Sequence, residues 1–120
     1  MTDLATLRTE REDDTVFAVV DGEVDPSNAR DLGHELTAGV PNDAMAMVLD
    51  LSEVAYLDSS GVQMIFELVE RLDARQQRLA VVVPHGAPAR KVLDIVALDT
   101  TAPLAATRDE ALALLSAPRR

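Results

Sequence analysis

Two segments near the start of the chain, rich in apolar and β-branched residues, predict two strands. They are residues 4–9 and 15–21, and the polar segment 10–14 lies between them. This pattern predicts an antiparallel hairpin, with Gly22 ending the second strand.

Longer apolar runs predict the remaining strands. Residues 44–50 and 79–83 are almost wholly apolar, as in strands that are covered on both faces of a parallel sheet. Residues 100–104 form a weaker segment that carries Pro103, which predicts a strand at the edge of the sheet.

Helical spacing separates these strands. Asp25 and Pro26 are typical of a helix start, as N-cap and first helical residue, and Gly39 predicts the end of that helix. A second amphipathic segment begins at Ser60. Its predicted core face consists of Val62, Ile65, Phe66, Val69 and Leu72.

Two further helices complete the predicted order. One spans residues 87–98, and the Thr107–Glu110 capping box precedes another over residues 111–115. Strands that alternate with helices predict an α/β fold, with a mixed, mostly parallel sheet of four to five strands and about four helices. We expect residues 1–120 to form a single domain with flexible tails at 1–3 and 117–120.

Composition narrows the possible functions. Aromatic residues make up only 2% of the chain, which leaves little to stack on bases and argues against direct nucleic-acid binding. The chain has no cysteine, which excludes disulfides and thiolate metal sites. No apolar run approaches the roughly 18 residues of a membrane span, and the first residues lack the pattern of a signal peptide. We therefore expect a cytoplasmic protein without a membrane partner.

The negative charge lies in the first half of the chain. The net charge is −10; residues 1–58 hold 14 acidic residues against 3 basic ones, whereas residues 59–120 hold 7 against 8. This distribution fits either solubility alone or a basic protein partner.

The tetrapeptide Asp58–Ser59–Ser60–Gly61 is the strongest candidate site. It places small hydroxyl side chains at a helix N-terminus, where free backbone N–H groups favour an added anion. Phosphorylation of Ser59 is one interpretation; the other is that Asp58 or Ser59 only caps the helix. Gly61 would let a partner backbone approach closely.

Other residues extend this candidate site. Glu23 and Asp25 follow the second predicted strand, so they would share one end of the molecule with Ser59 if the strands on either side are neighbours. Met64 and Leu68 are interpreted either as an apolar docking stripe or as the margin of the core.

Residues typical of catalysis or cofactor binding are missing from the sequence. There is no Gly-rich phosphate loop, no metalloprotease motif and no nucleophile elbow, and His34 and His85 are isolated. We therefore expect neither enzymatic activity nor a metal or other cofactor.

These residues together resemble the STAS domain family, and within it the bacterial anti-sigma factor antagonists. The resemblance rests on Gly22–Asp25, on Asp58–Val62 after an apolar strand, and on Asp109–Leu112 in the last helix. It implies that a serine kinase, itself an anti-sigma factor, binds the protein and phosphorylates Ser59. Binding frees the sigma factor, and phosphorylation ends the binding until a PP2C-type phosphatase removes the phosphate.

The resemblance also implies roles for neighbouring residues. Asp25 matches the family aspartate that supports the kinase contact, and Asp58 and Ser60 would border the modified serine. Gln63 and Ala97 depart from residues common in the family. A non-switching STAS scaffold or ligand-binding module remains the alternative, and a small phosphotransfer enzyme or nucleotidase is a third.

Overall fold

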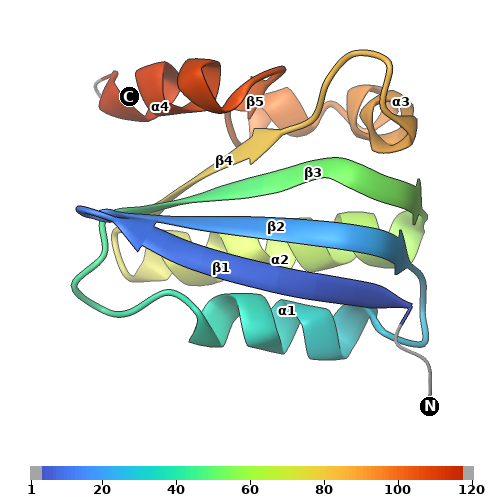
Figure 1. Ribbon diagram of the computed structural model, residues 1–120, viewed down its shortest axis with the longest axis horizontal. Helices are drawn as coiled ribbons and strands as arrows, with labels where there is room; N and C mark the ends of the chain where they lie inside the picture. The colour runs from blue at the N-terminus through green and yellow to red at the C-terminus, as the bar shows by residue number, and fades with distance from the viewer. Residues whose placement is uncertain (1–3, 118–120) are drawn as a thin grey trace.

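The computed structural model describes residues 4–117, which form one five-stranded sheet with helices on both faces (Figure 1). The elements in chain order are β1 (Ala5–Glu12), β2 (Thr15–Val24), α1 (Ala29–Ala38), β3 (Ala46–Leu57), α2 (Ser59–Ala74), β4 (Arg78–Val82), α3 (Pro88–Ile95), the 3₁₀ turn η1 (Leu98–Thr100), β5 (Leu104–Ala105) and α4 (Arg108–Ser116). The predicted tails, 1–3 and 117–120, lie outside the described residues except for Ala117.

The sheet follows the predicted plan. Its strand order is β1-β2-β3-β4-β5; β1 pairs antiparallel with β2, and every other pair is parallel. The predicted α/β class, with a mixed and mostly parallel sheet and four α-helices, is therefore confirmed for the described part of the chain. Within residues 4–117, no helix combines the length and apolar character that crossing a bilayer requires.

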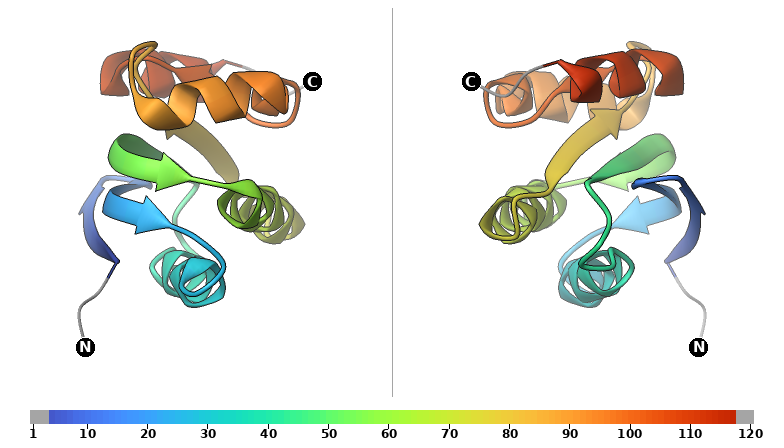
Figure 2. Two further views of the ribbon diagram at one scale, coloured as in Figure 1. Left: turned by 90° about the vertical axis from the view of Figure 1, so that its right-hand side faces the viewer. Right: turned by 90° about the vertical axis from the view of Figure 1, so that its left-hand side faces the viewer.

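Alternate residues of the central strands face two different hydrophobic clusters. Met47 and Leu49 of β3 join the large cluster under α1, α2 and α3, whereas Val48 between them joins the smaller cluster under α4. This alternation is the period of two expected of a strand covered on both faces. Helices α1 and α2 lie side by side on the larger cluster (Figure 2).

Glycine 22 changes the predicted end of the hairpin. Strand β2 continues past Gly22 to Val24. The backbone of Gly22 has φ +122°, and a Cβ there would lie 2.2 Å from the carbonyl oxygen of Leu4. Glycine therefore permits an irregularity inside the strand, so the prediction that it ends the strand is wrong.

Other predicted boundaries also shift. Helix α1 begins at Ala29 and not at Pro26, and α3 ends at Ile95, before the left-handed backbone of Ala97 (φ 53°). The hairpin turn is also shorter than predicted, because β1 extends to Glu12. Edge strand β5 is confirmed, but it begins only at Leu104.

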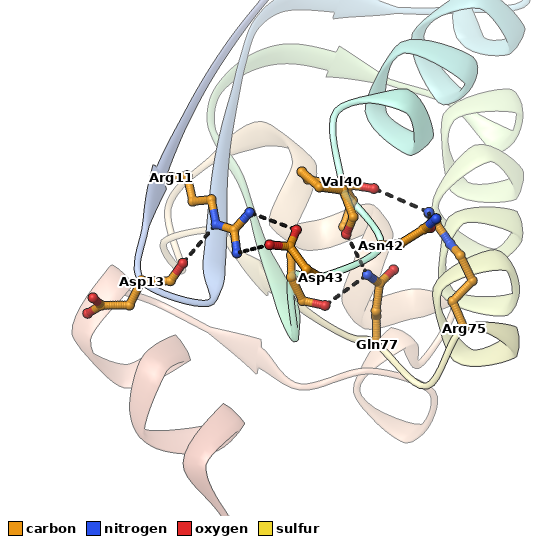
Figure 3. A network of polar contacts seen from close by, with 9 residues as sticks. Arg11, Asp13, Val40, Asn42, Asp43, Arg75 and Gln77 are labelled. Carbon is orange, nitrogen blue, oxygen red and sulfur yellow. Dashed lines mark hydrogen bonds and ion pairs between the residues drawn. The ribbon is translucent and has the colours of Figure 1, made fainter.

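Polar contacts fix the end of the sheet where the parallel strands begin (Figure 3). The amide of Gln77 donates to the carbonyl oxygens of Pro41 (2.8 Å) and Ala44 (2.9 Å), and Arg75 donates to that of Val40 (3.2 Å). These bonds satisfy backbone groups of the loop between α1 and β3. The carboxyl ends of the strands, at the opposite end of the sheet, are left for the candidate site.

Candidate functional site

The two candidate loops leave the sheet side by side. Strands β2 and β3 are parallel neighbours, with Glu23 opposite Tyr56 and Val24 opposite Leu57, so both end at the right-hand edge in Figure 1. The structure therefore brings Glu23, at the end of β2, and Asp25, just after it, next to the start of α2, as predicted for adjacent strands.

Asp58 is the N-cap of α2. Its carboxylate accepts a 3.0 Å hydrogen bond from the backbone N–H of Ser60 and a further bond from the Ser60 hydroxyl. These bonds, with the Ser60 hydroxyl contributing most, lower the pKa of Asp58 below its ordinary value. Asp58 is thus ionised at neutral pH and holds Ser60 in place.

Ser59 is the first residue of α2 and is exposed. Among residues 4–117, no hydrogen bond engages its hydroxyl, whereas the hydroxyl of Ser60 is bound to Asp58. Of the two residues considered as caps, Asp58 caps the helix and Ser59 does not. The Ser59 hydroxyl thus lies on an exposed residue and makes no hydrogen bond to residues 4–117 that a modification would break.

Tyr56 belongs to this site, and the sequence reasoning missed it. The residue is 47% exposed, and its hydroxyl donates a 3.4 Å hydrogen bond to Asp58. The negative charge of Asp58 contributes most to raising the pKa of Tyr56, and the charges of Asp25 and Glu23 add to it. Tyr56 therefore reports that three carboxylates surround this end of the molecule. The pairing of Tyr56 with Glu23 across β2 and β3 would have placed Tyr56 in the site. That pairing depends on the register of the two strands, which the sequence pattern does not give.

The Asp25 loop is held rigid by Asn28, which the sequence reasoning also missed. The Asn28 side chain donates to the carbonyl oxygen of Glu23 (2.8 Å) and accepts from the backbone N–H of Asp25 (2.9 Å). The Asp25 carboxylate accepts from the backbone N–H of Ser27 (2.8 Å) and from its hydroxyl. Asp25 thus caps a turn and not helix α1, which explains why the helix begins later than predicted.

Gly61 has a different role from the predicted one. It is buried, and a Cβ there would lie 2.3 Å from Leu57 Cδ1 and 3.1 Å from Val24 Cγ1. Its bare side faces the core, so it does not provide the predicted space for a partner backbone. Glycine at this position instead lets the start of α2 pack directly on the ends of β2 and β3.

Met64 and Leu68 are parts of the core. Met64 is 4% exposed and Leu68 is fully buried. A docking stripe made of these side chains is therefore wrong, and the core-margin interpretation holds. Met64 nevertheless lines the floor of a groove between α1 and α2.

The described residues offer no metal centre. No group of three or more His, Cys, Asp or Glu side chains within residues 4–117 is placed to hold a metal ion. The site is thus an exposed hydroxyl on a helix start, bordered by fixed carboxylates.

The sequence pattern of the STAS domain matches residues 6–111. An anti-sigma factor antagonist from Mycobacterium paratuberculosis has 30% sequence identity and a TM-score of 0.78, with 94% of this chain and 95% of that chain covered. BtrV, a proposed anti-sigma factor antagonist of Bordetella bronchiseptica, is 29% identical over 109 residues, which are 89% of this chain and 91% of BtrV.

The Bacillus anti-sigma factor antagonist SpoIIAA shares the fold. Its unphosphorylated form has a TM-score of 0.70 at 20% identity and covers 96% of this chain and 100% of that chain. Its phosphorylated form has a TM-score of 0.60 at 20% identity, with 92% and 99% covered. The sequence match spans most of the described residues, so the chain belongs to the STAS domain family, and its relatives include anti-sigma factor antagonists.

Proposed function

We propose that this protein is an anti-sigma factor antagonist whose binding is switched by phosphorylation of Ser59. In the unphosphorylated state it binds an anti-sigma factor that is also a serine kinase, and the sigma factor is released. The observation that carries the proposal is the exposed Ser59 hydroxyl, which is free of hydrogen bonds within residues 4–117 and lies next to the ionised cap Asp58.

The electrostatics of the site explain how such a switch works. A phosphate on Ser59 adds about −1.5 to −2 charges at neutral pH. A partner that docks here must match the carboxylates of Glu23, Asp25 and Asp58, and the added dianion changes the charge and shape that it meets. Mismatched charges across an interface cost several kcal/mol.

The fold tolerates the modification. The cap bonds of α2 belong to Asp58 and Ser60, so phosphorylation of Ser59 leaves them intact. The phosphate lies at the positive end of the helix, which favours an anion there. The modification therefore alters what a partner meets and not how the chain folds.

The comparisons support the proposal at the level of the family. Relatives at 29% and 30% identity are named as anti-sigma factor antagonists. SpoIIAA has been solved in both unphosphorylated and phosphorylated forms, which makes modification of this chain a reasonable proposal.

The proposed partners follow from this cycle. They are the kinase that binds and modifies the protein and a PP2C-type phosphatase that restores it. We propose that the protein acts by binding and without catalysis, in the cytoplasm where sigma factors work. Asp25 is the residue best placed to hold the kinase, because Ser27 and Asn28 fix its loop.

Phosphate mapping tests this proposal. The full-length protein is incubated with ATP and candidate anti-sigma kinases, and phosphate is located by mass spectrometry. We expect a single phosphate on Ser59, lost in Ser59→Ala and retained in Ser60→Ala. Phosphate on Ser60 instead of Ser59 would contradict the switch. If no cognate kinase phosphorylates the protein at all, the result would also contradict the switch and favour a non-switching scaffold.

A further inference from the structure

A groove of about 500 Å³ runs between helices α1 and α2. It begins beside the Ser59 site, because Pro26 and Ser60 line one end of it. Ala29 and Gly33 of α1 and Met64 of α2 give it a floor of small or apolar side chains. Because this groove adjoins the candidate site, a protein docked over Ser59 can extend into it.

Gly33 keeps the two helices close. A Cβ at Gly33 would lie 3.1 Å from Met64 Cγ, so any larger residue would require Met64 to shift by a few tenths of an ångström. The same point lies 4.0 Å from a guanidinium nitrogen of Arg71, which shows that Arg71 of α2 reaches across to α1. The groove therefore has a cation bridging its two walls.

The charge of the groove is opposite to that of the molecule. The chain has a net charge of −10, yet the charged residues that line the groove include two arginines, Arg30 and Arg71, against the single carboxylate of Glu67. His34, one turn after Arg30, also lines the groove.

These cations are only weakly neutralised. Arg71 forms a distant ion pair with Glu67, with an N–O distance of 3.9 Å. Within residues 4–117, the side chains of Arg30 and His34 form no ion pair or hydrogen bond. Arg30 is also one of only 3 basic residues among the first 58. The groove thus exposes positive charge that residues 4–117 neutralise only weakly, through the Arg71–Glu67 pair.

We propose that the α1–α2 groove binds an acidic segment of the protein that docks over Ser59. Such a partner carries basic groups opposite Glu23, Asp25 and Asp58 and carboxylates opposite Arg30 and Arg71. This two-sign pattern fixes the orientation of the partner, since a reversed partner meets like charges at both places. The identity of the partner rests on the proposed function, but the preference of the groove for an acidic segment does not.

Two matched peptides test the groove independently of phosphorylation. ¹⁵N-labelled full-length Ser59→Ala protein is titrated with a helical peptide of repeated Glu and Ala and with its Lys counterpart, at low ionic strength. We expect the acidic peptide to shift the amide signals of Gly33, His34 and Gln63. We expect the basic peptide to shift signals near Asp25 and Asp58 instead.

The charge of the groove is tested by a variant and its matched control. The double variant Arg30→Ala/Arg71→Ala should weaken binding of the acidic peptide roughly tenfold. Arg8→Ala/Lys91→Ala removes the same charge from exposed positions on β1 and α3 and should change binding much less. Both amide spectra also report whether the variants remain folded.

Several results would overturn the inference. These are equal binding of both peptides in the groove, equal losses in the two double variants, or shifts that map elsewhere. Self-association that the Arg30→Ala/Arg71→Ala variant abolishes would assign the groove to a second copy of the chain and would also overturn it. If the groove binds the acidic peptide as expected but no kinase modifies Ser59, the proposed function is contradicted, whereas the preference of the groove for an acidic segment is supported.

Discussion

Gly61 and Gly86 differ in what an added methyl group would meet. At Gly61 it would lie 2.3 Å from a methyl carbon of Leu57, which is itself 5% exposed, whereas nothing lies within 4 Å at Gly86. Overpacking lowers the free energy of unfolding by about 1–3 kcal/mol, and the better helix propensity of alanine offsets up to about 1 kcal/mol of this loss. We predict that Gly61→Ala lowers the free energy of unfolding by about 1–2 kcal/mol.

Urea unfolding of both alanine variants checks this prediction. Gly86→Ala should stay within about 0.5 kcal/mol of the native protein, because the position is open. Equal stability of the native protein and Gly61→Ala would show that Leu57 can move aside.

Tyr56 offers a direct probe of the acidic surroundings. It is the only tyrosine, and the chain has no tryptophan, so its absorbance and fluorescence are free of overlap. The neighbouring carboxylates, Asp58 foremost, raise the pKa of Tyr56 above its ordinary 10.0. We predict that ultraviolet titration shows ionisation above pH 10.0 and that Asp58→Asn shifts it down. An unchanged titration in that variant would mean that Asp58 does not act on the phenol.

Sequence reasoning identified most members of the site because topology alone places them. Glu23 lies at the end of β2, and Asp25 and Ser59 follow β2 and β3. Because these strands are parallel neighbours, they end at one edge of the sheet. Tyr56 and Asn28 were not predicted. The role of Tyr56 depends on the strand register and that of Asn28 on side-chain hydrogen bonds, and the hydrophobic pattern of the sequence determines neither.

The way α2 packs against its neighbours explains the two wrong predictions about this helix, those for Met64 and Gly61. The sequence placed Met64 at the edge of the apolar face of α2, but α1 packs against that edge and buries it. Gly61 likewise faces Leu57 and Val24 and not a partner. A single amphipathic pattern gives the core face of a helix but not the neighbours that cover its margins.

At the scale of elements, the order could be predicted and several ends could not. The apolar run over residues 44–50 predicted the first part of β3, whereas the observed strand continues to Leu57 through its pairing with β2. An Asp-Pro start for α1 failed because Asn28 and Ser27 compete for the same backbone and carboxylate groups.

The Asp58 cap makes the stability of α2 depend on pH. The pKa of Asp58 in the folded protein lies below its ordinary 3.8. Its contribution is therefore complete above about pH 3.8 and is lost as the pH falls through the lower folded value. We predict that the urea midpoint of the native protein falls below pH 4 more steeply than that of Asp58→Asn. The exposed variant Asp99→Asn is the control; parallel curves for native protein and Asp58→Asn would refute the linkage.

At the scale of the whole molecule, a charge at Ser59 should change binding without unfolding the protein. Ser59 has no bond to lose within residues 4–117, and a carboxylate at a helix start is favourable. We predict that Ser59→Asp shifts the thermal midpoint by less than about 5 °C while it weakens binding to the proposed anti-sigma kinase. Calorimetry and a binding titration on one sample check both parts; extensive unfolding would show that Ser59 has a structural role.

The molecule separates its structural and proposed functional ends. Arg75 and Gln77 fix the loop at the amino ends of the parallel strands, whereas the carboxylates and Ser59 lie at the carboxyl ends. A modification at the second end leaves the polar network at the first untouched. In the proposed switch, the sheet is the support for a surface whose charge changes at Ser59.

The affinity of the proposed anti-sigma kinase for two forms of this protein tests the central claim most directly. Unphosphorylated protein and protein phosphorylated on Ser59 are titrated into the same kinase by calorimetry, with unphosphorylated Ser60→Ala as control. We predict that phosphate on Ser59 weakens binding at least about a hundredfold, whereas Ser60→Ala binds within about tenfold of the native protein. Equal affinities of the phosphorylated and unphosphorylated forms would contradict the account.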